Sequence, residues 1–343
     1  MANQTENGKA FEYACMIALY ERLKDNGEIV LEDSSQMQTA KKFFDEMDLT
    51  IQNKLVDAAN AAARVVIQLE PQLFNPQDNV PLYIAIQTDA QGIAGDVRDV
   101  VCIRKQNKWQ IGLSCKHNHH AVKHSRLSDT IDFGKEWFNI PCSKQYFSEV
   151  TPIFSELRTI RDKSKDNGNP ALWADVEDKA KRYYVPILQS FLDELNRLAS
   201  ANPEVPGRLI NYLLGRYDFY KIITDDKHKT TRVEAINICG SLGRNSGNAK
   251  PLVNIEKLKL PTRFYHAGFK RDSNNTVEVV CDEGWTISMR IHNASSRIEP
   301  SLKFDVQLVS LPSSIYAQME PWDNVNEGLV HRIQAYASRI IKQ

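Results

Sequence analysis

The chain has 343 residues, of which 42% are hydrophobic and 25% charged, as is typical of a soluble globular protein large enough for two lobes. Its 43 basic residues balance 43 acidic ones, and no apolar run approaches the ~18 residues of a membrane-spanning helix. The first residues lack a signal-peptide pattern, and the six cysteines are scattered. We therefore expect a cytoplasmic protein with reduced thiols and no membrane partner.

The overall neutrality hides an asymmetry. Residues 1–100 carry sixteen acidic and eight basic side chains, so the remainder carries a net charge of +8. A polyanion requires a local basic surface rather than a positive total. Composition therefore permits a nucleic-acid partner.

The N-terminal part is predicted to be helical. Over 8–25, apolar residues recur at intervals of three and four, and Glu12 lies on their side of the helix. Its carboxylate is either buried, where it needs a partner or a metal, or it lies at the boundary and reaches solvent. Residues 35–70 predict two more helices, the second capped by Asp48.

Alternating apolar residues then predict a meander of three strands over about 82–87, 99–105 and 108–116. Helices are expected at 143–160, at 170–198 with a kink at Pro186, and at 205–215. Further strands are expected at 218–224, 231–239, 276–281, 284–293 and 302–309, and residues 240–276 are predicted to be loop-rich.

The stretch 95–124 carries the chemistry. After Asp96 and Asp99 no acidic residue follows until Asp129, whereas six basic residues and four of the eight histidines lie between. This arrangement suits a site that holds a divalent cation beside a polyanion. Asp99 and Lys116 are seventeen residues apart, which fits two strands and a short turn, so they can meet at one end of the sheet.

These residues resemble a known active site. Asp99, Ser114, Cys115 and Lys116 resemble the D…(D/E)xK pattern of PD-(D/E)XK nucleases, with Glu12 in the place of their first-helix acid. More specifically, the chain resembles the HaeIII-type restriction endonucleases. The matching stretches are GKAFEYAC at 8–15, GDVRDVV at 95–101, IGLSCKHNHHAVKHSRL at 111–127, DFGKEWF at 132–138, and GWTISMRIHNASSRIEPSLKFDVQLVSLP at 284–312.

The resemblance implies a type II enzyme that cleaves double-stranded DNA centrally at GGCC with Mg²⁺, leaving 5′-phosphate and 3′-hydroxyl ends. It implies that Asp99 is the central metal ligand and Lys116 the active-site lysine. Ser114 departs from the pattern, because a hydroxyl is a poor substitute for a carboxylate on Mg²⁺. Either Glu12 or Asp96 supplies the missing charge, or Ser114 acts through a bound water.

Asp96 competes with Asp99 for the central role. Three residues apart, the two face opposite sides of a regular strand. Asp99 is favoured because it lies inside the apolar strand, whereas Asp96 follows a turn glycine and suits a capping role. The backbone carbonyl of Cys115 is a candidate for a further metal ligand.

The histidines permit a different chemistry, either zinc binding or a histidine–metal nuclease site. Against both, no CxxC pair and no clear four-ligand set is present. We instead expect this segment to line the DNA backbone. The residues concerned are His117, Asn118, His119, Lys123, His124 and Arg126.

The C-terminal strands carry a second candidate interface. Arg290 and His292 lie on the polar face of one strand, Lys303 and Asp305 on that of the next. A two-stranded ribbon can enter a major groove, where Arg or Lys binds guanine and Asp accepts from cytosine. We expect Arg290 and Lys303 to read guanine and Asp305 to read cytosine. His292, Asn293 and Arg244 complete the residues expected to contact DNA.

The predicted architecture is an α/β restriction-endonuclease-like core with a mixed central sheet flanked by helices. The catalytic core is expected over 1–165, and a helical and β-rich recognition portion over 166–343. The palindromic target is compatible with a homodimer. The alternatives are a non-catalytic sequence-specific DNA-binding protein, a histidine–metal nuclease and a zinc-binding structural protein.

Overall fold

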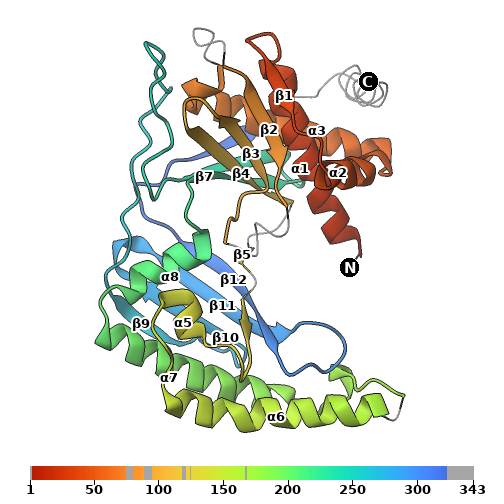
Figure 1. Ribbon diagram of the computed structural model, residues 1–343, viewed down its shortest axis with the longest axis vertical. Coiled ribbons are helices and arrows are strands. Elements are labelled where there is room, and N and C mark those ends of the chain that lie inside the picture. Colours follow the sequence, from red (N-terminus) through yellow and green to blue (C-terminus); the bar gives the residue numbers. More distant parts are fainter. Residues whose placement is uncertain are drawn as a thin grey trace. The chain divides into compact units, whose positions relative to one another are not determined.

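The computed structural model describes residues 2–74, 80–88, 95–117, 121–123, 125–166 and 168–322, with only the backbone at 2–4, 117 and 121–123 (Figure 1). The chain forms two compact units. Unit 1 contains residues 1–120, 216–258 and 314–343, and unit 2 contains 121–215 and 259–313. The expected boundary at 165 is wrong as a packing boundary, because both units are built from segments distant in sequence.

Unit 1 begins with the three predicted helices, α1 (Ala2–Leu23), α2 (Ser35–Asp45) and α3 (Leu49–Leu69). The Asp48 side chain accepts from the backbone N–H of Ile51 at 3.0 Å, which confirms it as the cap of α3. Ser34 caps α2 through Met37 in the same way. Within the described residues, no helix is long and apolar enough to cross a membrane.

The sheet of unit 1 is mixed, with strand order β1-β2-β3-β4-β7-β8-β13. The predicted meander is present as antiparallel β2, β3 and β4, and β7 then pairs with β4 in parallel. The strands are β1 (Ile29–Leu31), β2 (Leu82–Ile86), β3 (Val100–Arg104), β4 (Trp109–His117), β7 (Phe219–Asp225), β8 (Thr230–Ile236) and β13 (Ala317–Pro321).

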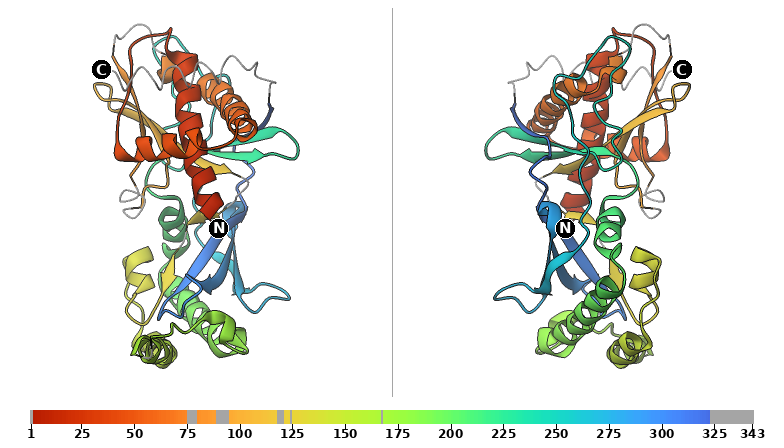
Figure 2. Two further views of the ribbon diagram at one scale, coloured as in Figure 1. Left: turned by 90° about the vertical axis from the view of Figure 1, so that its right-hand side faces the viewer. Right: turned by 90° about the vertical axis from the view of Figure 1, so that its left-hand side faces the viewer.

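The two faces of this sheet differ in polarity. Helices α1 and α3 lie against this sheet (Figures 1 and 2). Leu113 and Cys115 of β4 and Tyr220 and Ile222 of β7 join the residues of these helices in one buried core. Because side chains alternate along a strand, the intervening residues of β4 face the other side. These residues are Gln110, Gly112, Ser114 and Lys116. The helices therefore cover the apolar face and leave the polar face for chemistry.

Unit 2 contains a sheet of order β5-β12-β11-β10-β9, with β6 also paired to β12. Its strands are β5 (Ala121–Lys123), β6 (Arg126–Leu127), β9 (Phe264–Phe269), β10 (Thr276–Cys281), β11 (Thr286–Asn293) and β12 (Leu302–Ser310). Phe304 of β12 packs against Trp137 and Phe191 of two helices. The helices are α5 (Phe133–Phe138), α6 (Lys144–Asp166), α7 (Val185–Ala201) and α8 (Val205–Leu214).

One prediction in this region is wrong in its bounds. The helix expected over 170–198 begins with the π-helical turn Ala180–Tyr184, which continues directly into α7, and Trp173–Asp175 is a separate short segment. Pro186 follows that turn at once, so the helix departs from α geometry just before the proline, where a kink was expected. The segment 240–276 is loop-rich as predicted, and it also contains the edge strand β9.

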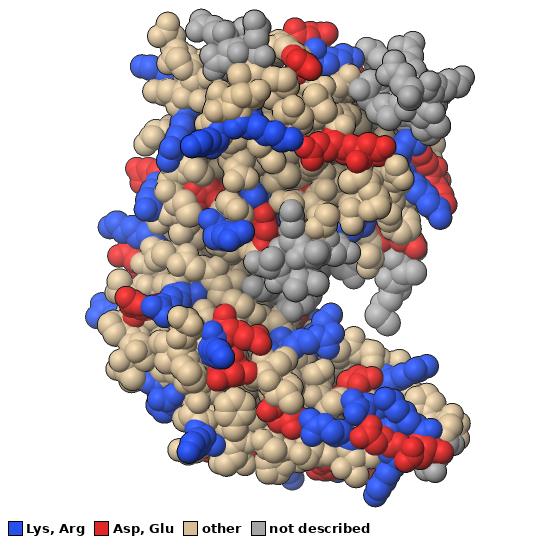
Figure 3. Space-filling model, viewed as in Figure 1, with Lys and Arg blue, Asp and Glu red and all other residues tan. Residues whose placement is uncertain are grey.

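Charges of both signs are interspersed on the face shown in Figure 3. The basic residues visible on that face therefore do not form one continuous patch.

The side chain of Arg98 lies against Gly112 and leaves no room for a Cβ atom there. A Cβ at Gly112 would lie 2.1 Å from Cδ of Arg98 and under 3 Å from Cγ and Cβ, so the stem itself would have to move. We expect Gly112→Ala to lower the free energy of unfolding by about 1–3 kcal/mol. Gly8→Ala is the matched control, since nothing lies within 4 Å of its Cβ position in α1, and a helical alanine should stabilise by about 0.5–1 kcal/mol. Urea unfolding measures both, and equal effects would contradict this role for Gly112.

Candidate active site

Asp99 and Lys116 meet at the open end of the β3–β4 hairpin, as their spacing predicted. Lys116 Nζ lies 3.1 Å from Asp99 Oδ2, and the backbone N–H of Cys115 donates to the same oxygen at 2.6 Å. The backbone N–H of Asp99 donates to the carbonyl of Leu113 at 2.7 Å. Burial alone would lower the pKa of Lys116, but the charge of Asp99 raises it above its ordinary value, so the ammonium stays charged.

Glu12 reaches the same site from α1. It is only 7% exposed, which decides between the two sequence-based interpretations in favour of burial. Burial raises the pKa of Glu12 to about 7 and the charge of Asp99 raises it too, whereas Lys9 and Lys116 act in the opposite direction. Glu12 and Asp99 are therefore two carboxylates whose charges repel, and each pairs with a lysine, Glu12 with Lys9 at 3.2 Å and Asp99 with Lys116 at 3.1 Å.

This arrangement fits a divalent metal ion. Mg²⁺ binds through one or two carboxylates and keeps several waters, and it would relieve the repulsion between Glu12 and Asp99. In a strand the N–H and C=O of one residue point to the same neighbour, so the Cys115 carbonyl lies on the Asp99 side. Among the described residues no three His, Cys, Asp or Glu side chains are grouped to hold a metal. Water would have to complete the coordination.

The Cys115 thiol has no part in this arrangement. It faces Cys15 in the core, and burial raises its pKa well above the ordinary value, so it stays a neutral thiol. All six cysteines of the chain are free, in agreement with the expected reduced thiols.

The carboxylate of Asp96 pairs with Arg98 and not with Lys116. Its two carboxylate oxygens accept from Nε and Nη2 of Arg98 at 2.8 and 2.7 Å, and one also accepts from Gln87 at 2.9 Å. Arg98 is buried, and its guanidinium lies 3.9 Å from the ring centre of Tyr217. Asp96 also accepts from the backbone N–H of Arg98 at 3.2 Å, as expected of a capping residue, and its pairing with the buried arginine side chain was not predicted.

Ser114 lies on the polar face of the sheet and is buried. The residue opposite it on β7 is Lys221, and opposite Lys221 on β8 is Glu234. Both are buried, and neither was predicted as a site residue. The signal that could have found Lys221 is a lysine placed between apolar residues in FYKII, a strand whose residues are all buried.

Most of the histidine segment lies outside the described residues. Asn118, His119, His120 and His124 are among the residues left out, and His117 and Lys123 are described by their backbones alone, at the end of β4 and in β5. The DNA contacts expected of this segment stay predictions.

In unit 2, Arg290 and Asp305 stand directly opposite each other on β11 and β12. Arg290 Nη2 lies 3.2 Å from Asp305 Oδ2, and Arg290 is exposed, whereas Asp305 is only 7% exposed. The buried carboxylate thus lies behind the exposed guanidinium. Asp305 therefore holds Arg290, and its expected contact with cytosine stays a prediction.

The other polar residues of this sheet lie near one end. Lys303 is opposite His292 on β11 and opposite Arg126 on β6. Arg126 is exposed and donates to Ser301 Oγ at 3.2 Å, while His292 Nδ1 lies 2.8 Å from the carbonyl oxygen of Asn293. Of the residues expected to contact DNA, those on three neighbouring strands of this sheet are therefore brought together: Arg126, Arg290, His292, Asn293, Lys303 and Asp305.

The expected two-stranded ribbon is not an isolated one. β10 flanks β11, and β5 and β6 flank β12, so both strands lie inside a larger sheet. A hairpin enclosed on both sides cannot insert into a groove as a ribbon does. Any base contact from Arg290 must come from the face of the sheet.

Arg244 lines a cavity of about 380 Å³ in unit 1, at the starts of β4 and β7. Its guanidinium donates from Nε and Nη2 to the carbonyl of Gly240 at 3.1 and 2.9 Å. Arg98, Lys108 and Arg216 also line the cavity. Since Asp99 and Lys116 lie at the other end of the hairpin, Arg244 is not part of the carboxylate–lysine site.

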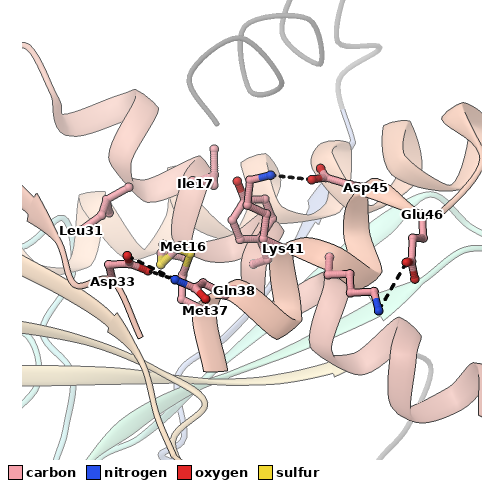
Figure 4. A pocket seen from close by; sticks show the side chains of 11 residues that line it. Met16, Ile17, Leu31, Asp33, Met37, Gln38, Lys41, Asp45 and Glu46 are labelled. Carbon is pink, nitrogen blue, oxygen red and sulfur yellow. Dashed lines mark hydrogen bonds and ion pairs between the residues drawn. The ribbon is translucent and has the colours of Figure 1, made fainter. Parts of the chain in front are cut away.

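A second cavity, of about 670 Å³, lies among α1, α2 and β1 (Figure 4). Its charged groups pair with one another, Lys41 with Asp45 at 2.5 Å and Lys42 with Glu46 at 3.7 Å. None of the predicted site residues lines it. It therefore adds nothing to the site at Asp99.

Two carboxylates and a lysine at one end of a mixed sheet define a site suited to metal-assisted phosphodiester hydrolysis, the chemistry of a nuclease. The comparisons identify the kind of nuclease. The chain belongs to the HaeIII restriction endonuclease family, whose sequence model matches residues 8–312. It is 39% identical over 326 residues to the type II restriction enzyme HaeIII of Haemophilus aegyptius, covering 94% of this chain and all of that protein.

The predicted enzyme class, a type II restriction endonuclease acting on DNA, is thereby confirmed. The mixed α/β fold is confirmed as well. No solved structure matches the chain.

The raised pKa of Glu12 has a consequence for stability. Between pH 4.5 and about 7 the folded state keeps a proton that the unfolded state has released, so the free energy of unfolding of the metal-free protein falls as pH rises. At pH 8 the free energy of unfolding is lower by about 3 kcal/mol than it is below pH 4.5. We expect Glu12→Gln to remove this part of the pH dependence, measured by urea unfolding in EDTA at pH 5 and pH 8.

Glu21→Gln is the matched control, because Glu21 stands on the same helix and pairs with Lys24 at 2.7 Å. If the free energy of unfolding of Glu12→Gln differed between pH 5 and pH 8 as much as that of the wild type, Glu12 could not be the buried carboxyl that titrates.

Proposed function

We propose that this enzyme hydrolyses double-stranded DNA at GGCC with Mg²⁺, cutting centrally to leave 5′-phosphate and 3′-hydroxyl ends. The observation that carries the proposal is the contact of Lys116 with Asp99, with buried Glu12 near both. The GGCC target rests on the resemblance to HaeIII-type enzymes. Because the substrate is DNA inside a prokaryotic cell, we propose the cytoplasm as the location.

We further propose that unit 1 is a PD-(D/E)XK-type core. Its support is the order of elements, with a helix bearing an acid, an antiparallel meander and then a parallel strand beside β4. Asp99 and Lys116 stand on neighbouring strands of that meander, as the pattern requires. The departure at Ser114 leaves the second acid to Glu12.

Asp99 and Glu12 would hold the Mg²⁺, with the Cys115 carbonyl as a third ligand. When bound, the ion supplies positive charge to the phosphate and lowers the pKa of a water. Lys116, kept charged by Asp99, orients the attacking water or stabilises the charge on the pentacovalent phosphorus. The water oxygen bonds to phosphorus as the bond to the 3′-oxygen breaks, and that oxygen takes up a proton.

We propose that unit 2 recognises the base sequence of the DNA. Arg290 is exposed and uses one nitrogen on Asp305, which leaves other N–H groups for guanine O6 and N7. Lys303 is a second candidate for guanine, and Arg126, His292, Asn293 and, in unit 1, Arg244 are proposed as further DNA contacts. The twofold symmetry of GGCC is compatible with a homodimer or with a monomer that cuts the strands in turn.

The catalytic assignment is tested by Asp99→Ala and Lys116→Ala. Both should abolish cleavage of a GGCC duplex in Mg²⁺, because they remove a metal ligand and the charge beside the phosphate, while the circular dichroism spectrum stays unchanged. Lys105→Ala is the control, since Lys105 lies in the same hairpin but pairs with Glu32 at 3.2 Å. Cleavage by Lys116→Ala at the wild-type rate would refute the assignment, and cleavage in EDTA would refute the metal.

The recognition assignment is tested by titrating Arg290→Ala against a GGCC duplex and a scrambled duplex. A base reader should lose about 1–3 kcal/mol on GGCC and little on the scrambled DNA. Arg271→Ala, on the exposed β9–β10 turn, is the control. An equal loss on both duplexes would make Arg290 a phosphate contact instead.

A further inference from the structure

Four polar residues form one row across the polar face of the unit 1 sheet. The β3–β4 register pairs Val100 with Leu113, so the next step places Asp99 opposite Ser114. Ser114 is opposite Lys221, and Lys221 is opposite Glu234. Neighbouring strands are about 4.8 Å apart, and residues directly opposite share a face. The row therefore begins at the carboxylate of the proposed nuclease site and continues for three more strands.

Lys221 is the buried cation of this row, only 4% exposed. Burial lowers its pKa, Glu234 acts in the opposite direction, and the charges of Lys116 and Arg232 lower it further. A buried ammonium group is costly unless a partner holds it. Glu234 stands directly opposite Lys221 and its charge favours the ammonium, while Glu234 accepts from Nε of Arg232 at 2.7 Å.

Glu234 thus stands beside two cations, Lys221 by register and Arg232 by a hydrogen bond. The charge of Lys116 reaches Lys221 from the adjacent strand. Positive charge gathered next to Asp99 suits an anion. The anion that the proposed reaction brings to this place is the phosphate being cut.

We propose that Lys221 is a second phosphate-binding lysine of the nuclease site, held in place by Glu234, and that position 114 is neutral for this reason. The inference rests on the proposed function and extends it. A carboxylate at 114 would stand directly opposite Lys221 and bind its ammonium, which would remove the cation from the phosphate. The phosphate contact of Lys221 then explains both why this lysine is present in the sheet and why position 114 has no acid.

The test combines a change in the protein with a change in the DNA. Lys221→Met keeps the length of the side chain but removes its charge, and a phosphorothioate at the cut site replaces one of the two non-bridging oxygens. If Lys221 contacts one of these oxygens, sulfur in that position should slow the wild type by about tenfold more than it slows Lys221→Met. Single-turnover cleavage in Mg²⁺ with each diastereomer measures this coupling.

Lys227→Met, in the exposed β7–β8 turn, is the matched control and should cleave like the wild type. Lys221→Met should cleave the unmodified duplex at least about tenfold more slowly, and Lys221→Arg should restore part of the rate. If Lys221 had only a structural role, each phosphorothioate diastereomer would slow cleavage by the same factor in the wild type and in Lys221→Met. That result would overturn the inference.

Ser114→Asp supplies a test that does not depend on the folding of Lys221→Met. We expect it to slow cleavage rather than to restore the pattern, and to have no further effect in a Lys221→Met background. Faster cleavage by Ser114→Asp would overturn the inference. If Lys116→Ala is inactive while Lys221→Met cleaves at the wild-type rate, this inference fails and the proposed function stands.

Discussion

The site depends on one carboxylate oxygen. Oδ2 of Asp99 accepts from the backbone of Cys115 and from the ammonium of Lys116, while the backbone N–H of Asp99 binds β4. The Asp99 side chain thereby extends the hydrogen bonding between β3 and β4 by one residue. Because the ladder fixes the register, the position of the lysine relative to the acid is set by the hairpin and not by the loop that follows it. A slip of one residue would turn Lys116 to the apolar face.

Charge balance explains why burial is tolerated there. Glu12 and Asp99 repel, and burial favours the neutral form of Glu12, so at neutral pH the metal-free site can hold a proton that a divalent cation would displace. Asp96 binds the guanidinium of buried Arg98 through both of its carboxylate oxygens. Glu12 and Asp99 each pair with a single lysine, at 3.2 and 3.1 Å, and remain able to bind an ion as well.

The sequence allowed the local part of this site to be predicted, because a seventeen-residue spacing and a strand period of two are sufficient to bring Asp99 to Lys116. The neighbour of Ser114 could not be found this way. It depends on which strand lies beside which, and β4 pairs with a strand that begins a hundred residues later. The interleaving of the two units escaped prediction for the same reason, since local pattern carries no information on pairing between distant segments.

The pairing of Arg290 with Asp305 changes how recognition by unit 2 is understood. A free arginine loses rotamer entropy when it binds a base, whereas one already held by a buried acid loses less. Lys303 has no such acid directly opposite it, only His292 and Arg126. Of the two guanine readers proposed, Arg290 is therefore the one whose geometry is prepared before DNA arrives. Its buried partner also has an oxygen, Oδ1, without a hydrogen bond, which a second guanidinium nitrogen or a water can satisfy on binding.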